Sequence, residues 1–134
     1  MDYILFDDFK KMDLYQDFVK KNPLLGEIRV QVIGASGAVP IEGARVEIYK
    51  DIGELDVLFF QGETDSNGVI NHILLPAPVK VPIGPLEVPE YSIYFMNVEK
   101  DGFQSLEKYS FMVMDGVEGV QNIMMKPIVD IEKN

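Results

Sequence analysis

The chain carries, at residues 27–33, the run Glu-Ile-Arg-Val-Gln-Val-Ile, in which polar and apolar side chains alternate. This period of two is typical of a β-strand with one exposed and one buried face. Further extended segments follow at residues 44–50, 57–63, 69–74, 91–99, 109–114 and 120–125. Seven short strands separated by turns predict a mainly β protein, folded as a seven-stranded antiparallel β-sandwich.

The segments between these strands are rich in turn-forming residues. Asp65-Ser-Asn-Gly68 places Asn and Gly, which tolerate a positive φ, between two apolar runs and so predicts a hairpin. The stretch from Leu75 to Glu90 holds five of the eight prolines. Because proline cannot donate to a sheet ladder, we expect a stiff loop along an edge or end of the sandwich there.

Residues 4–21 have a different period. Apolar side chains recur every three or four positions with Asp or Lys between them, which predicts a short amphipathic helix that ends at Asn22-Pro23. Two interpretations are open: the helix packs on its own domain, or it docks on a neighbouring subunit or partner. The candidate protein-interaction residues are the five aromatic side chains of this region, Tyr3, Phe6, Phe9, Tyr15 and Phe18.

Length and composition limit the domain organisation. With 134 residues, 47% apolar and 25% charged, the chain is expected to form one globular domain. We expect the N-terminal helix and linker at residues 1–25, the β-sandwich at 26–128 and a short tail at 129–134. The net charge of −10 at pH 7 disfavours nucleic acid and anionic lipid as partners.

The sequence also shows no feature of export or of disulfide chemistry. It contains no cysteine, which excludes disulfides, thiolate nucleophiles and Cys-ligated zinc. Acidic residues follow Met1 where a signal peptide would have basic and then apolar residues. We therefore expect a chain made in the cytoplasm without a signal peptide and without membrane insertion.

Few residues suit catalysis or metal binding. His72 is the only imidazole, and no Ser/His/Asp or Cys/His grouping can be assembled around it, so a small hydrolase is the least favoured class. Asp65 and Asn67 could begin a calcium loop, but the twelfth position, where an EF-hand needs Glu, is Pro76. Gly34-Ala-Ser-Gly37 lacks the Lys and the following helix of a phosphate loop. We therefore predict no enzyme activity, no metal and no cofactor.

A sugar site would depend on tyrosine, because Trp, a common stacking platform for sugar rings, is absent. The tyrosines of the predicted strands are Tyr49, Tyr91, Tyr94 and Tyr109. An alternative function is thus recognition of cell-envelope glycan such as peptidoglycan, with Tyr91 and Tyr94 as candidate contacts.

Four segments together resemble a known family. They are Ile28-Arg-Val-Gln-Val32, residues 40–49 beginning Pro-Ile-Glu-Gly-Ala, residues 62–70 containing Thr-Asp-Ser-Asn-Gly, and residues 91–103 ending Asp-Gly-Phe. Their order resembles the carboxypeptidase-regulatory-like domains of the transthyretin-like (prealbumin-like) superfamily over residues 27–127. The resemblance implies a transthyretin-like sandwich.

Two further segments narrow the resemblance. Leu74-Leu-Pro-Ala-Pro78, and Pro89-Glu-Tyr-Ser-Ile-Tyr94 after a proline-rich insert, are similar to domains of Firmicute spore-cortex-lytic proteins and of phage or prophage proteins of such bacteria. In those settings the domain is an accessory, interaction or structural unit. The resemblance implies a non-catalytic structural or adaptor protein, which docks on partner proteins or on copies of itself in a virion or tail-like particle.

Two active types of relative do not match this chain residue by residue. The transthyretin-like hydrolases of urate breakdown use several His, an Arg and a C-terminal Tyr-Arg-Gly-Ser, whereas this chain has one His and ends Ile131-Glu-Lys-Asn134. Adhesin domains with an internal Lys–Asn bond need a first-strand Lys and a later Glu, where this chain has Gln31-Val-Ile33 and Met96. Neither the hydrolase activity nor the crosslink is therefore expected.

Overall fold

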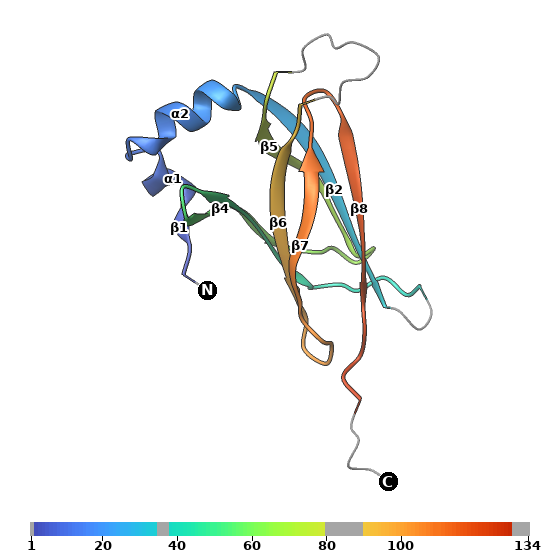
Figure 1. Ribbon diagram of the computed structural model, residues 1–134. Helices are drawn as coiled ribbons and strands as arrows, with labels where there is room; N and C mark the ends of the chain where they lie inside the picture. The colour runs from blue at the N-terminus through green and yellow to red at the C-terminus, as the bar shows by residue number, and fades with distance from the viewer. Residues whose placement is uncertain (1, 35–37, 80–89, 130–134) are drawn as a thin grey trace.

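The computed structural model describes residues 2–34, 38–79 and 90–129, which form a β-sandwich with two short helices near the N-terminus (Figure 1). In chain order the elements are β1 (Ile4–Leu5), α1 (Phe6–Phe9), α2 (Leu14–Lys21), β2 (Leu24–Gly34), β3 (Arg45–Ile52), β4 (Leu55–Glu63), β5 (Val69–Ala77), β6 (Ser92–Glu99), β7 (Leu106–Val113) and β8 (Glu118–Met125).

The strands form two sheets. The larger sheet has the order β1-β4-β3-β6-β7, and the smaller sheet has the order β5-β2-β8. The seven predicted strands correspond to β2 through β8, so the predicted β-sandwich is confirmed, with β1 as an additional two-residue strand. The pairing differs from the prediction at two places, since β1 runs parallel to β4 and β2 runs parallel to β8.

The N-terminal segment is helical over less of its length than its periodicity predicted. Residues 4–5 form β1, and a turn at residues 10–13 separates α1 from α2. Ile4 and Leu5 are extended because they pair with the edge of β4. A four-residue helix has no stability of its own, so contacts with the sheet decide the conformation and override local propensity.

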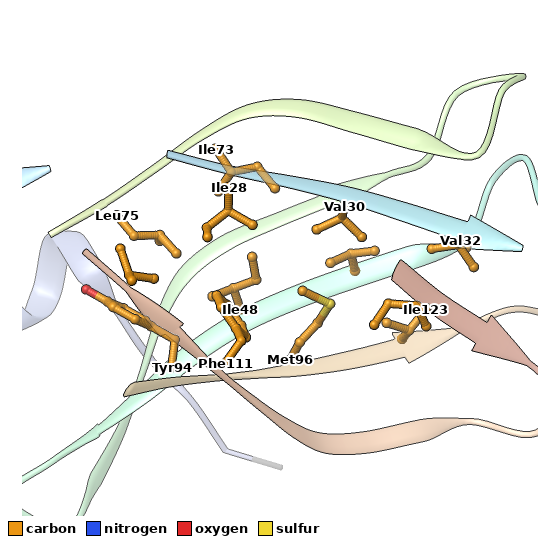
Figure 2. Close-up of a cluster of buried hydrophobic side chains, with 14 of the residues drawn as sticks. Ile28, Val30, Val32, Ile48, Ile73, Leu75, Tyr94, Met96, Phe111 and Ile123 are labelled. Atoms are coloured by element: carbon orange, nitrogen blue, oxygen red, sulfur yellow. The ribbon is translucent and has the colours of Figure 1, made fainter. Parts of the chain in front are cut away.

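The main core lies between the two sheets (Figure 2). β2 alternates strictly, so Ile28, Val30 and Val32 are buried while the residues between them are partly exposed. The larger sheet contributes Ile48 from β3 and Met96 from β6, both fully buried. Most of these side chains are aliphatic and follow the two-residue period that the sequence shows.

A second, smaller cluster lies under the helices. Phe9 of α1 and Phe18 of α2 are buried against Val57 of β4. Phe59, two residues farther along the same face of β4, has its ring centroid 5.6 Å from that of Phe18 and 5.3 Å from that of Tyr94 in the main core. The helices therefore pack on their own domain, which is the first of the two interpretations of this segment.

The hairpin predicted at residues 65–68 joins β4 to β5. Asp65 Oδ1 accepts hydrogen bonds from the backbone N–H groups of Asn67 and Val69, each at 2.9 Å. Gly68 has φ +73°, and a Cβ at this position would collide with a backbone carbonyl of β2. The turn thus needs glycine both for its backbone conformation and for its close approach to β2.

The proline-rich stretch is described only in part. Residues 75–77, which were expected to belong to a loop, continue β5, and Pro76 lies in that strand. β5 is an edge of the smaller sheet, where a missing N–H is tolerated. Residues 80–89, and residues 130–134 of the predicted tail, lie outside the described residues.

Candidate protein interaction surface

His72 lies on the exposed side of β5, with 85% of its side chain exposed. Its Nδ1 is 2.8 Å from Oε1 of Glu27 on β2. Within residues 2–34, 38–79 and 90–129, no three His, Cys, Asp or Glu side chains are arranged to hold a metal ion. The surroundings of His72 are therefore those of a surface contact with one carboxylate.

The two tyrosines predicted as glycan contacts lie in different environments. Tyr91 precedes β6 and is 43% exposed. Tyr94 is fully buried, its hydroxyl donates a hydrogen bond to the carbonyl oxygen of Pro76 at 2.7 Å, and burial raises its pKa well above the usual value. Because Tyr94 faces the core, the two rings do not form a common platform for a sugar.

The five aromatic candidates of the N-terminal segment are mostly turned inward. Phe9 and Phe18 are buried, whereas Tyr3, Phe6 and Tyr15 are half-buried. Phe6 has its ring centroid 6.2 Å from that of Tyr15, so four of the five rings belong to the cluster under the helices. These contacts within the chain leave little aromatic surface of this segment for another molecule.

Tyr3 lies apart from that cluster, against the larger sheet. Its ring centroid is 5.3 Å from that of Tyr49, and its hydroxyl accepts a hydrogen bond from Nδ2 of Asn97 at 2.8 Å. Burial, and then the carboxylate of Glu47, raise the pKa of Tyr3 to about 12. Tyr3 therefore packs the segment before β1 against the larger sheet.

An exposed apolar surface lies on the smaller sheet, on the side away from the core. We call it the outer apolar face and define it by four outward side chains, Leu25, Leu74, Val120 and Met124. Their exposed fractions range from 47% for Val120 to 58% for Met124. All three strands contribute, with Leu74 on β5, Leu25 on β2 and the other two on β8. Alternation along each strand puts these side chains opposite the buried ones of the main core.

The outer apolar face is interrupted by three charged side chains. The carboxylates and guanidinium that point outward from its three strands are Glu27, Glu118 and Arg29. The net charge of −10 is therefore carried largely by other parts of the molecule. In the register of the strands, Glu27 lies beside Leu74 and Glu118, and Arg29 lies beside Val120. Since two of these charges are negative and one is positive, the face adds little to the net negative charge that a partner would meet.

Sequence reasoning did not identify this face. A signal was present where apolar residues interrupt the alternation, in Ile73-Leu-Leu75 of β5 and in Ile123-Met-Met125 of β8. A strand with one solvated face needs no apolar residue at the middle position of such a triplet. Leu74 and Met124 are those middle residues, and they mark the exposed surface.

Several solved structures share this architecture at low sequence identity. The TIE protein of Bacillus anthracis matches with a TM-score of 0.57 and 17% identity over 83% of this chain and 20% of its own. The 3-chlorocatechol 1,2-dioxygenase of Rhodococcus opacus gives 0.57 and 12% over 81% of this chain and 62% of its own. The pilus 2b backbone protein of group B streptococcus gives 0.51 and 11% over 81% of this chain and 43% of its own.

These likenesses concern the fold. They show the β-sandwich that the resemblance in the sequence implied. The chain spans only a fifth of the TIE protein and less than two thirds of the other two structures. No family model matches this chain, and no curated protein sequence matches it either.

The prediction that the chain is no enzyme needs correction. The dioxygenase has this sandwich as part of its chain, so the architecture is shared by enzymes and by proteins such as a pilus backbone. The fold class and the missing triad motif therefore do not exclude catalysis. At 12% identity no catalytic residue is carried over from the dioxygenase.

None of the helices in the described ranges has the length and hydropathy needed to span a bilayer.

Proposed function

We propose that this chain is a structural or adaptor protein that docks on a partner protein through the outer apolar face. The single observation that carries the proposal is the exposure of Leu25, Leu74, Val120 and Met124 together on one sheet. Apolar side chains gathered on one face of a folded domain are typical of an interaction site. A similar fold also occurs in a pilus backbone protein, and the backbone of a pilus is a structural part.

The setting that we propose is a phage or prophage virion or a tail-like particle, into which the chain is incorporated. This part rests on the resemblance of residues 74–78 and 89–94 to domains of phage proteins. The partner is expected to present an apolar patch, with basic side chains around it. Such a rim would complement the net charge of −10 and speed association at low salt.

The test measures retention of the labelled chain on purified particles of the source organism. Leu74→Lys and Val120→Lys each place a charge in the outer apolar face and are expected to reduce retention at least about tenfold. Met112→Lys is the matched control, because Met112 is a 52% exposed side chain on the larger sheet. Equal losses for all three variants, or no retention of the unmodified chain, would contradict the proposal.

A second candidate function is recognition of cell-envelope glycan, which one observation favours. The exposed Tyr91 lines a hollow of about 700 Å³ together with Lys21, Asn22 and Lys50. A pull-down with purified peptidoglycan tests it: specific retention that Tyr91→Ala abolishes would support this function. Tyr94→Ala would not inform the test, because loss of that buried ring destabilises the core.

A further inference from the structure

The two sheets have four edges, and β8 forms the least protected of them. β1 has only two residues, and β5 contains Pro76 and pairs with β2 through an irregular register. β7 also pairs irregularly, at the step between Met96 and Val98 of β6. β8, in contrast, pairs with β2 in eight consecutive steps without irregularity. Natural sheets usually block such a long straight edge with a proline, a bulge or a lysine.

The peptide groups on the free side of β8 can be assigned from its neighbours. The carbonyl of Val117 accepts a hydrogen bond from the N–H of Glu27, so the backbone N–H and carbonyl groups of the odd-numbered residues of this segment point toward β2. Consecutive residues point their peptide groups to opposite sides. The backbone N–H and carbonyl groups on the free side are then those of Glu118, Val120, Asn122 and Met124. None of these groups bonds to another strand in the described parts of the chain.

The free edge has a defined end. The carbonyl of Lys126 accepts a hydrogen bond from the N–H of Gln104 at 2.8 Å, and the N–H of Ile128 donates one to Gly102. Residues 126–128 are therefore already paired with the segment before β7. The available edge thus runs from Glu118 to Met124.

In the described parts of the chain, no backbone hydrogen bond of another strand occupies the side of β8 that faces away from β2. β7, an edge of the larger sheet, lies beside β8 and contacts it mainly through side chains. One such contact is the hydrogen bond from the hydroxyl of Tyr109 to Oε1 of Gln121 at 2.8 Å. A hollow of about 310 Å³ separates the two strands, lined by Phe111 and Met112 from β7 and by Gly119 from β8. Figure 1 shows the two strands next to each other as members of different sheets.

We propose that β8 pairs antiparallel with β8 of a second copy of this chain, joining the two smaller sheets into one. An antiparallel pair brings residues of the same face opposite each other. The register centred on Gln121 places Glu118 opposite Met124 and Val120 opposite Asn122 of the other copy. It pairs every free residue on both edges and stops before Lys126, whose carbonyl is occupied.

The charges of β8 fit this self-pairing. Glu118 is the only charged residue of the strand, so no like charges lie opposite each other in the chosen register. Each Glu118 lies diagonal to Lys126 of the other copy, two residues beyond Met124. Diagonal side chains on one face are within reach of long side chains, so both ends of the pair gain an attraction between opposite charges. A two-fold axis makes the contact self-complementary and closed.

The first test is amide hydrogen exchange of the full chain at low and at high protein concentration. The N–H groups of Glu118, Val120, Asn122 and Met124 are expected to become at least about tenfold more protected as concentration rises. The amides of Gly119, Gln121 and Ile123, which point toward β2, should be protected at both concentrations. A chain that sediments as a monomer at every concentration, or a dimer without this alternation, would overturn the proposal.

The second test exchanges the charges at the ends of the pair. Glu118→Lys and Lys126→Glu are each expected to weaken dimerisation about tenfold in sedimentation equilibrium, because each brings like charges together. The double variant restores opposite charges and should regain most of the lost affinity. No regain in the double variant would rule out this register.

Asn122→Pro removes one N–H on the free side and leaves the bonds to β2 in place, so the dimer should be lost while the sandwich persists by circular dichroism. A dimer that survives this change would also overturn the proposal. Leu74→Lys, which tests the outer apolar face, is expected to change dimerisation less than about twofold. Dimerisation through β8 and docking through the outer apolar face can therefore be confirmed or contradicted separately.

Discussion

The larger sheet is covered on its inner side by two different layers. One part packs against the smaller sheet, through mostly aliphatic side chains such as Val30 and Ile48. The other part, at β4, packs against α1 and α2 through the rings of Phe9 and Phe18. Strands provide many small contacts at a period of two, whereas two short helices must bury enough surface with few residues, and large rings do so.

The comparison shows how a sandwich with sheets of five and three strands closes its core. The smaller sheet does not extend over the whole of β4, and the helical segment covers the remainder. Phe59 is the residue that both layers share, since its ring lies against Phe6 and Phe18 on one side and Tyr94 on the other. The stability of the helical layer is therefore expected to depend on the sandwich.

The largest effect is expected for Phe59→Ala, which removes the ring that joins the layers. The substitution should lower the free energy of unfolding by about 3–5 kcal/mol, measured by urea denaturation. Phe9→Ala removes a ring of equal size that does not contact the main core. It should loosen the amides of α1 and α2 in hydrogen exchange and leave those of β3 protected. Equal loss of protection in both layers would show a single cooperative unit.

A smaller effect is expected at Thr64, in the part covered by the smaller sheet. Its buried hydroxyl donates a hydrogen bond to the carbonyl of Ile41 at 2.6 Å and accepts one from the N–H of Ala44 at 2.9 Å. Thr64→Val keeps the shape but leaves both backbone groups unpaired. We expect a loss of about 1–3 kcal/mol in thermal or urea unfolding. Thr64→Ser keeps the hydroxyl and is the control, which should lose less.

A pH effect is expected from Lys50, which lies where the two layers meet. Its Nζ donates a hydrogen bond to the carbonyl of Ile93 and lies 4.9 Å from the ring centroid of Tyr94, and burial lowers its pKa from 10.5 to about 8. In the unfolded chain the Lys50 ammonium keeps its proton to higher pH than in the folded chain, so stability should rise between about pH 8 and pH 10. Because Lys50 is partly exposed and screened by solvent, the rise should stay below about 1.4 kcal/mol per pH unit.

Lys50→Met should remove this rise, which unfolding curves at several pH values would show. Above about pH 10 the buried tyrosines act in the opposite direction. Their pKa values are raised in the folded state, so their contribution to stability is lost as the pH rises through the folded pKa. An equal slope below pH 10 in Lys50→Met would contradict the assignment to Lys50.

The smallest effect is expected for the exposed charges of α1. Lys10 lies 3.6 Å from Asp7 and 4.8 Å from the ring centroid of Phe6, and all of these contacts are at the surface of the helical layer. Lys10→Gln should change the free energy of unfolding by less than about 0.5 kcal/mol. A larger loss would mean that charge contributes to this layer as well as the aromatic rings.

Much of the fold could be predicted from the sequence because alternation and turn chemistry are local signals. Residues 27–33 and the turn at 65–68 form the predicted strand and hairpin, with boundaries shifted by a few residues. The parallel pairing of β2 with β8 could not be predicted, since it joins segments about ninety residues apart. The single helix predicted over residues 4–21 was wrong in detail, because β4 holds Ile4 and Leu5 extended.

The candidate site was less accessible to sequence reasoning. Tyr94 carried the same local pattern as Tyr91, and only the packing of β6 shows that one is buried and the other exposed. The outer apolar face combines residues of three strands that meet only after folding. The docking role of the N-terminal aromatics stays a prediction, although Phe9 and Phe18 are engaged within the chain.

The parallel pair of β2 and β8 has a consequence for synthesis in the cell. Residues 27–34 leave the ribosome about ninety residues before one of their two partner strands, residues 118–125. During that interval one side of β2 stays open to chaperones and to other nascent chains. A message truncated before Glu118 would therefore release a product in which one side of the central strand is uncovered.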